Sequence, residues 1–373
     1  MKKYIFLLIV VMVFVNCQEK QKPSSSNISV DIEQRDKVSV FDIFNKIEII
    51  PLETNDSSLI IEIDKLIPYY NRFYLFDYKM QKVSVFDDTG KFLFNVGNKG
   101  GGPDEYFHIS DFDIHYQKLS LVSPVDGNLI SYDLEGGFLE RYRLPDTQSS
   151  FKCLKYINND TIAFWTFDYN NRLKLYSQLN KEFVKETMPE EDNIFNSFST
   201  AVFPYNNYLA RTIDNKVYEI TLQGDVVVAY EWDFGKLNNR VKKLKVPDLS
   251  SHEKKIEYVK KIHASEVINY IFSEEGGNSE YVYTQLSRKN KLINIFYNKK
   301  SKENYVFEET SEKAKIFPMY WAEDYMIGIC PDIENLTLDN ILPDTILDEV
   351  NRIKKNSWEE LDNPLLIKYY FKK

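Results

Sequence analysis

One group of residues has types and spacing that could hold a small ligand or a cation: Asp111, Asp113 and His115. On a strand, side chains at i, i+2 and i+4 share one face, while Phe112 and Ile114 point to the other. Carboxylates on one face repel each other, which favours a bound cation, a water or raised pKa values. Oxygen ligands suggest calcium or magnesium, and the imidazole would tolerate zinc. A solvated polar strand face would show the same pattern.

Motifs for catalysis are otherwise sparse. There is no Gly-x-Ser-x-Gly elbow, no His-Glu-x-x-His and no cysteine pair at zinc spacing. The glycine-rich stretch 97–103 is not a phosphate-binding loop, because no Gly-Lys-Ser/Thr follows it and no helix begins there. The 56 acidic residues leave a carboxylate-pair hydrolase open, but any pair chosen by eye would be arbitrary.

Composition indicates an ordered, strand-rich chain. Of 373 residues, 43% are hydrophobic, and 25 Phe and 26 Tyr favour strands over helices. The formal net charge of −9 argues against nucleic acid as a partner.

The N-terminus predicts export and lipid attachment. Lys2 and Lys3 precede an unbroken apolar run, residues 4–15, which is shorter than the roughly 20 residues that span a bilayer but suits a signal peptide. The run ends at Asn16-Cys17, and a cysteine at this place is the acceptor of bacterial lipoprotein processing. We therefore expect a signal peptide over 1–16, a lipid on Cys17 and a flexible tether over 17–37. The alternative is an ordinary secretory signal with an incidental cysteine.

Two further cysteines, Cys153 and Cys330, are too few for a disulfide framework. They could pair in an oxidising compartment, although two buried thiols fit the count better.

Internal repeats determine the expected fold. Turn residues after similar apolar strands fall at Gly90, Gly136, Asn180 and Gly224, at intervals of 46, 44 and 44 residues. This period is typical of a four-stranded propeller blade. The chain then predicts an all-β, six-bladed β-propeller with blades over about 60–103, 104–145, 149–189, 198–236, 267–309 and 316–373. A β-sandwich would not explain the constant spacing.

A ring of blades needs to be closed, since open sheet edges remain otherwise. The segments 38–41 and 47–50 are candidates for an outer strand that pairs with the last strand, 365–371.

Two helices are expected outside the blades. The insertion 237–266 reverses the local charge, and Ser250 and Glu253 form a capping-box pattern for a helix through His263. This helix would place Ile256, Val259 and Ile262 along one side, either packed on the rim or docking an acidic partner or lipid headgroups. Near the C-terminus, residues 345–355 predict a helix behind Asp344, with one face made of apolar side chains: Ile346, Leu347, Val350 and Ile353.

Several motifs in order carry a resemblance to a known family. Residues 50–54, 85–87, 90–91, 100–106 and 363–366 resemble those of the six-bladed β-propeller lipoproteins of Bacteroidota, propellers in the manner of NHL repeats. The resemblance covers about residues 38–373. It implies a structural turn motif, made of Gly100, Gly102, Pro103, Glu105 and Tyr106. Members mostly lack a defined activity, so the resemblance implies fold and cellular address rather than chemistry.

These observations predict a monomeric, non-enzymatic binding or scaffold module, anchored in the outer membrane and facing the periplasm. The tail after Cys17 lacks the acid-rich stretch that such bacteria use for surface export, because Glu19 is accompanied by Lys20 and Lys22. The partner would be an envelope protein or a glycan. The alternative is an envelope glycan hydrolase or lyase with carboxylates at the channel mouth. A glycan-directed role predicts aromatics and carboxylates that converge on one face, whereas a scaffold predicts a broad apolar or charged patch.

Overall fold

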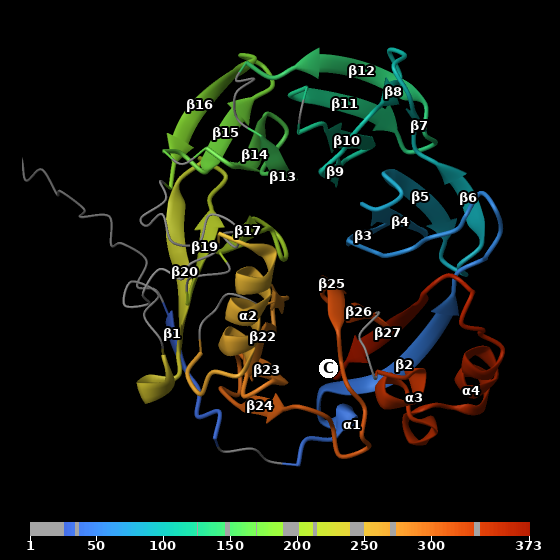
Figure 1. Cartoon of the computed structure of the whole chain (residues 1–373), viewed down its shortest axis with the longest axis vertical. Helices are drawn as coiled ribbons and strands as arrows, with labels where there is room; N and C mark the ends of the chain where they lie inside the picture. The colour runs from blue at the N-terminus through green and yellow to red at the C-terminus, as the bar shows by residue number, and fades with distance from the viewer. Residues whose placement is uncertain are drawn as a thin grey trace, which may run out of the picture.

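The computed structural model describes residues 26–33, 37–124, 126–145, 150–168, 170–188, 201–211, 215–238, 250–268, 274–331 and 336–373. Six small sheets stand in a ring (Figure 1). The chain is a six-bladed β-propeller, as the repeat period predicts. The first strand of each blade lies innermost, and the following strands lie progressively further out.

The first three blades each follow this plain order. Blade one contains β3 (Lys65–Tyr69), β4 (Arg72–Asp77), β5 (Lys82–Asp87) and β6 (Phe92–Asn95). Blade two contains β9 (Asp111–His115), β10 (Lys118–Val122), β11 (Asn128–Asp133) and β12 (Phe138–Arg143). Blade three contains β13 (Phe151–Tyr156), β14 (Thr161–Thr166), β15 (Leu173–Ser177) and β16 (Glu182–Thr187).

Blades four and six include strands from the N-terminal segment, whereas blade five does not. Blade four contains β17 (Ala201–Val202), β18 (Tyr208–Arg211), β19 (Lys216–Ile220), β20 (Val226–Asp233) and β1 (Ser26–Ser29). Blade five contains β21 (Glu274–Gly277), β22 (Tyr281–Arg288), β23 (Lys291–Asn298) and β24 (Asn304–Phe307). Blade six contains β25 (Pro318–Trp321), β26 (Tyr325–Ile329), β27 (Leu365–Phe371) and β2 (Phe44–Pro51).

Alternation along each strand packs every blade against both of its neighbours. In blade two, Phe112 lies against blade one, its ring centroid 6.4 Å from that of Phe76. Val122 and Leu129 lie in the cluster shared with blade three. Because both faces of a blade are covered, its middle strands are buried almost throughout, which explains why they read as continuous apolar runs.

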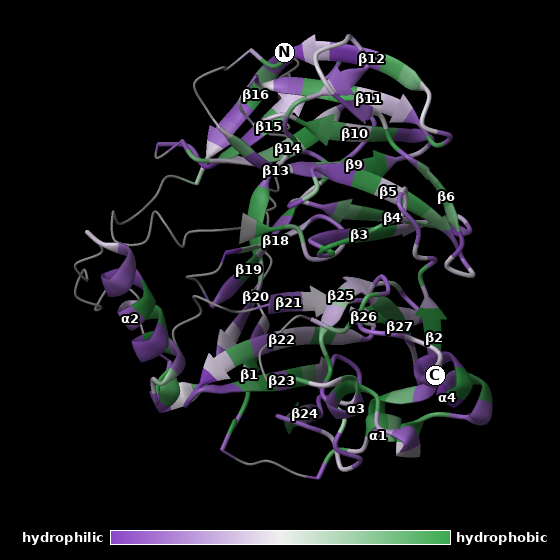
Figure 2. Cartoon of the chain, turned by 45° about the vertical axis from the view of Figure 1, so that its right-hand side comes forward, coloured by the Kyte–Doolittle hydropathy of each residue, from purple (hydrophilic) through white to green (hydrophobic). Residues whose placement is uncertain are grey.

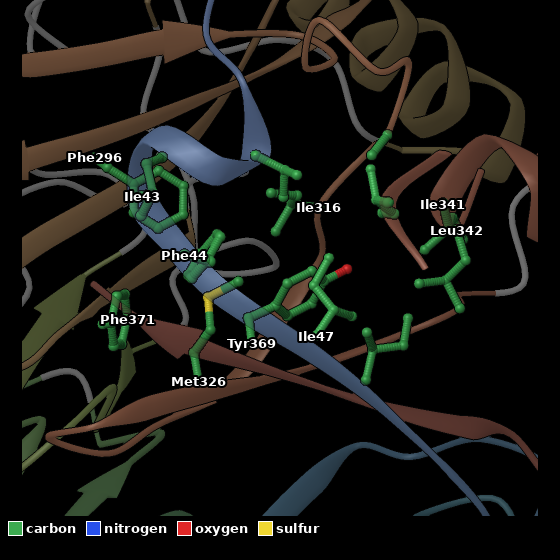
Figure 3. Close-up of a cluster of buried hydrophobic side chains, with 14 of the residues drawn as sticks. Ile43, Phe44, Ile47, Phe296, Ile316, Met326, Ile341, Leu342, Tyr369 and Phe371 are labelled. Carbon is green, nitrogen blue, oxygen red and sulfur yellow. The ribbon is translucent and has the colours of Figure 1, made fainter. Parts of the chain in front are cut away.

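The ring is closed by β2, which pairs antiparallel with β27 from Phe44–Phe371 to Pro51–Leu365. Phe44 is fully buried, and its ring contacts Phe371 and Tyr369 at centroid distances of 5.3 and 5.1 Å (Figure 3). The predicted closure over 47–50 is confirmed. The predicted strand over 38–41 is wrong, because Val40–Ile43 form the short helix α1. Ser39 and Asp42 form a capping box there, which satisfies backbone donors that a strand would have paired.

The segment expected as a flexible tether instead adds a fifth strand to blade four. Strand β1 pairs in parallel with β20, and Ile28 is buried beside Trp232. Beyond β1, Glu33 forms an ion pair with Arg288 of blade five at 2.5 Å. The N-terminal segment therefore contacts blades four, five and six in turn.

The insertion carries helix α2 (His252–His263), within the residues predicted for it. Its N-cap is Ser251 rather than Ser250, since the Lys254 backbone N–H donates to Ser251 Oγ at 3.3 Å. Ile262 is the buried residue of the helix, whereas Ile256 is 42% exposed. The helix stands away from the blades, so its predicted apolar side packs only near its end (Figure 2).

The C-terminal helix corrects a second expectation. After α3 (Leu338–Ile341) and the 3-10 turn η4 (Asp344–Ile346), helix α4 spans Glu349–Asn356, capped by Asp348 rather than Asp344. Ile346 and Leu347 are buried in the core just before the helix, as predicted, but Val350 and Ile353 are 62% and 63% exposed, so the four residues do not share one buried face.

The buried face of α4 is polar because it covers the outer edge of β2. Asn351 accepts a hydrogen bond from the Ile49 backbone N–H at 2.7 Å and donates to Ile47 O at 3.1 Å. Lys355 is buried on the same side and pairs with Asp344 at 2.8 Å. The backbone groups at an unpaired strand edge need hydrogen-bond partners. Helix α4 therefore turns its polar face toward β2, although its sequence pattern predicted that the apolar face would be buried.

The glycine-rich connection between blades one and two has a structural role. A short parallel pair, β7 (Asn98–Lys99) and β8 (Glu105–Tyr106), holds its ends together. The Gly102 backbone N–H donates to Glu105 Oε2 at 2.7 Å, and a Cβ on Gly100 would lie 2.1 Å from the same oxygen. The Glu105 carboxylate therefore holds the turn over Gly100 to Tyr106, which includes Pro103. Gly100 leaves room for this carboxylate because it has no side chain.

Candidate functional site

Asp111, Asp113 and His115 share one face of β9, as their spacing predicts. This face lies against β13, the inner strand of blade three. The Leu154 backbone N–H donates to Asp111 Oδ2 at 2.8 Å, and the Tyr156 N–H donates to Asp113 Oδ2 at 2.8 Å. The two carboxylates are therefore buried between blades rather than open to the channel, with exposed fractions of 5% and 1%.

Each carboxylate also has a lysine partner. Lys65, on the inner strand of blade one, places Nζ 2.9 Å from Asp111 Oδ1 and donates to Phe112 O at 2.7 Å. Lys155, on β13, places Nζ 3.2 Å from Asp113 Oδ1. We call these four residues the lysine–aspartate clasp: Lys65, Asp111, Asp113 and Lys155. It joins the inner strands of blades one, two and three.

The carboxylates of the clasp favour the charged form of Lys65, whereas burial raises the pKa of Asp111 despite the Lys65 ammonium beside it. Burial alone would lower the pKa of Lys65, but the Asp111 and Asp113 carboxylates outweigh it and raise this pKa above its ordinary value. A buried charge is tolerated when it is paired and hydrogen-bonded in this way.

The Cys153 thiol is not an activated nucleophile. Cys153 and Cys330 form no disulfide. Burial raises the pKa of the Cys153 thiol to about 12, so it stays protonated at neutral pH.

His115 does not complete a metal-ligand set with the two aspartates. Its Nε2 lies 3.0 Å from Asn159 Oδ1, and its ring stacks on Tyr156 with centroids 5.0 Å apart. Within the described residues, no group of three or more His, Cys, Asp or Glu side chains is placed to hold a metal ion. The positive charge that a cation would supply comes from Lys65 and Lys155.

The His115 end of β9 carries a group of aromatic residues that sequence reasoning missed. Tyr70 and Tyr116 are 77% and 64% exposed at the tips of the β3–β4 and β9–β10 hairpins. The Tyr69 ring meets that of Tyr70 edge-on at 4.8 Å, and the His115 ring meets that of Tyr116 at 4.5 Å. We call these four residues the tyrosine rim: Tyr69, Tyr70, His115 and Tyr116. Alignment of the repeats at their first hairpin could have found it.

The two hairpins of the tyrosine rim belong to adjacent blades, whose inner strands β3 and β9 contact each other. The two aromatic pairs therefore lie on the inner hairpins of neighbouring blades.

A second missed residue is Glu275, on the inner strand of blade five. Its Oε2 accepts hydrogen bonds from Trp232 Nε1 at 3.1 Å and from the Tyr230 hydroxyl at 3.4 Å. Burial raises its pKa to about 8. The adjacent glycines allow aromatics to press on this strand, since a Cβ on Gly276 would lie 2.0 Å from Trp321 Nε1. The sequence run Glu-Glu-Gly-Gly at 274–277 could have indicated this residue, because it places two acids beside two glycines on one short strand.

The fold and these inner strands define a six-bladed β-propeller whose buried inner acids are tied between blades. The chain belongs to the family described as "Domain of unknown function (DUF4934)", whose model matches residues 23–370.

Solved structures show the same fold at low sequence identity. A Bacteroides fragilis protein described as "Putative exported protein" is 17% identical, with a TM-score of 0.73 over 93% of this chain and 100% of its own. A DUF4221 family member from Bacteroides vulgatus is 10% identical, with a TM-score of 0.51 over 91% of this chain and 99% of its own. No curated protein matches the chain significantly.

Proposed function

We propose that this propeller is a lipid-anchored, non-enzymatic binding module of the bacterial cell envelope, monomeric and facing the periplasm from the outer membrane. The observation that carries the binding role is the contrast along β9. Asp111 and Asp113 are held by lysines and backbone donors, whereas Tyr116 stands exposed just beyond the other end of β9, as does Tyr70 on the β3–β4 hairpin of the neighbouring blade. The signal-like segment 1–16 and the similarity to a Bacteroides fragilis protein described as exported support export.

The position of β1 suggests how an anchored propeller would stand on a membrane. Cys17 lies outside the described residues, and β1 begins at Ser26, nine positions later (26 minus 17). Nine extended residues reach about 30 Å. Because β1 forms the outer edge of blade four, this blade would face the lipid surface.

Helix α2 fits such an orientation. It follows blade four in the chain and contacts β22 of blade five. Four exposed lysines on it favour anionic headgroups or an acidic partner: Lys254, Lys255, Lys260 and Lys261. Among the described residues, no helix has the length and apolar character needed to cross a membrane.

Replacement of the acceptor cysteine tests the anchor. Cys17→Ala should move the protein from the membrane fraction to the soluble fraction, because no thiol remains to carry the lipid. Cys153→Ala is the matched control and should leave fractionation unchanged. Membrane association that persists in Cys17→Ala would contradict the anchor.

A glycan hydrolase fits the inner acids less well. Glu274 and Glu275 are consecutive on β21, so their side chains point to opposite faces and cannot flank one glycosidic bond. The clasp aspartates are engaged by Lys65 and Lys155. These two pairs therefore favour binding over catalysis.

Capture from envelope extracts tests the binding role. The full-length protein should retain a specific glycan or protein partner, identified by analysing both classes of bound material. Heat-unfolded protein is the control. Recovery of the same material by both samples would contradict a binding role.

A further inference from the structure

The tyrosine rim combines exposure with an unusual backbone. Tyr70 and Tyr116 both have φ of 52°, in the left-handed region, as the first turn residue of equivalent hairpins. Blade four has Asn206, with φ of 45°, before its second strand. Asparagine and glycine tolerate this conformation, whereas a bulky aromatic residue adopts it at a cost in stability.

Packing within the propeller does not explain this cost. Both tyrosine side chains are mostly exposed, so they bury little apolar area in the folded chain. Strained residues that contribute little to a core are concentrated at ligand sites, where the strain holds a side chain ready for contact. Edge-on contacts with Tyr69 and His115 fix the two rings in place.

The surroundings of the rim are close to neutral. Arg72, beside the first hairpin, pairs with Glu135 at 2.8 Å. Lys118, beside the second, lies 2.9 Å from Gln178 Oε1 and 3.5 Å from Glu140 Oε1. Both cations thus have partners, which leaves little attraction for a phosphate or a uronic acid.

Polar groups that could orient a ligand are amides. Asn71 and Gln117 are the second turn residues of the two hairpins, and Asn159 lies beside His115 in blade three. All three are exposed. Amides can donate to and accept from hydroxyl groups without adding charge.

We propose that the tyrosine rim binds a neutral oligosaccharide, whose pyranose rings stack on Tyr70 and Tyr116. The C–H face of a pyranose is weakly positive and meets the negative face of a tyrosine ring, while its hydroxyls reach the neighbouring amides. Tyrosine supplies this contact area with little conformational entropy to lose. The inference rests on the proposed binding function and gives that function a ligand class and a site.

Titration calorimetry of the full-length protein tests the ligand class. The probes are neutral hexasaccharides of β-glucan, α-glucan and mannan, with oligogalacturonate as the charged comparison. We expect at least one neutral probe to bind in the millimolar range or tighter. No binding of any neutral probe, or binding of oligogalacturonate alone, would overturn the proposal.

Variants test the site. Tyr70→Ala and Tyr116→Ala should each weaken binding about threefold to tenfold, the loss expected for one aromatic contact. Tyr70→Phe should bind nearly as well as the native protein. Phe107 is 65% exposed and precedes β9, at the opposite end of that strand from His115, so Phe107→Ala is the matched control. Equal affinity in all variants would overturn the site.

A second measurement separates ligand binding from a structural role. Tyr70→Gly and Tyr116→Gly should raise the melting temperature by removing strain, and should weaken binding at the same time. A fall in melting temperature would indicate that the tyrosines serve packing. If the envelope capture retains its partner equally well with these variants, the binding function stands and the rim is not its site.

Discussion

The two ends of strand β9, the innermost strand of blade two, differ in what their side chains contact: one end contacts the neighbouring blades and the other faces solvent. At its start and centre, Asp111 and Asp113 are buried and hold blade three through backbone N–H groups and blade one through Lys65. At its end, His115 and Tyr116 form part of an aromatic group that faces solvent.

The difference shows how a propeller separates cohesion from recognition. Buried carboxylates need partners close by, so the neighbouring blades supply them and the charges become unavailable to ligands. Hairpin tips have no blade beyond them, and their side chains are free to contact other molecules. Acidic residues on an inner strand therefore indicate contacts between blades at least as readily as a ligand site.

The largest loss of stability should come from opening the ring, because the closed ring holds the inner strands of all blades in position. Deletion of residues 17–50 removes β1 and β2 and exposes the edge of β27. Each lost hydrogen bond is worth about 1 kcal/mol net, in addition to lost apolar burial, in a protein of marginal stability. We expect aggregation or a large fall in melting temperature by calorimetry. Deletion of residues 17–25 alone is the control, and equal melting of both deletions would contradict the closure.

Breaking the clasp should have the next largest effect. Asp113→Ala leaves the Lys155 ammonium and the Tyr156 N–H without this carboxylate. We expect urea unfolding to show a loss of about 2 to 3 kcal/mol.

The surface pair Lys185–Asp225, at 3.1 Å, provides the comparison. Asp225→Ala should change the free energy of unfolding by less than about 1 kcal/mol, because both partners are exposed. Similar losses in the two variants would show that the clasp is no stronger than a surface ion pair.

The half-buried Glu275, held by aromatic residues, should give the stability of the fold a distinct pH dependence. Burial raises the pKa of Glu275 from 4.5 to about 8, so the folded protein binds a proton that the unfolded chain releases across this range. The free energy of unfolding should therefore fall as pH rises from about 4.5 to 8. Glu275→Gln stays neutral and should flatten this part of the melting-temperature profile. Glu360→Gln, at an exposed position, should leave the slope unchanged. A native slope in Glu275→Gln would show that Glu275 is ionised in the fold.

The smallest effect is expected in calorimetric titration with cations, which should give no binding heat. Metal-stripped protein titrated with calcium, magnesium and zinc should show no saturable binding in the millimolar range, since lysines already neutralise Asp111 and Asp113. Saturable binding that disappears in Asp111→Asn/Asp113→Asn would restore these residues as a cation site.

Local patterns predicted much of the fold but not every partner. The spacing of Gly90, Gly136 and Gly224 marks turns that require positive φ, and all three have it. Helix α4 shows the limit, because an apolar pattern at 346–353 suggested the wrong buried face. Asn351 and Lys355 face inward instead, where the edge of β2 and Asp344 offer polar partners that a single helix cannot reveal.

The candidate site shows the same limit. Alternation along a strand placed Asp111, Asp113 and His115 on one face, and this geometry is confirmed. What that face meets depends on Lys65 and Lys155, which lie 46 residues before Asp111 and 42 residues after Asp113.

The sequence alone therefore determined the blade number, the strand periodicity, the closing strand and which residues share a strand face, because these depend on neighbours within one blade. Only the tertiary structure decided that β1 joins blade four, that lysines neutralise the inner aspartates and that two exposed tyrosines stand on hairpins of neighbouring blades. The physical reason is that these features join segments that lie far apart in the sequence. Their geometry is created when the ring closes, and no local period encodes it.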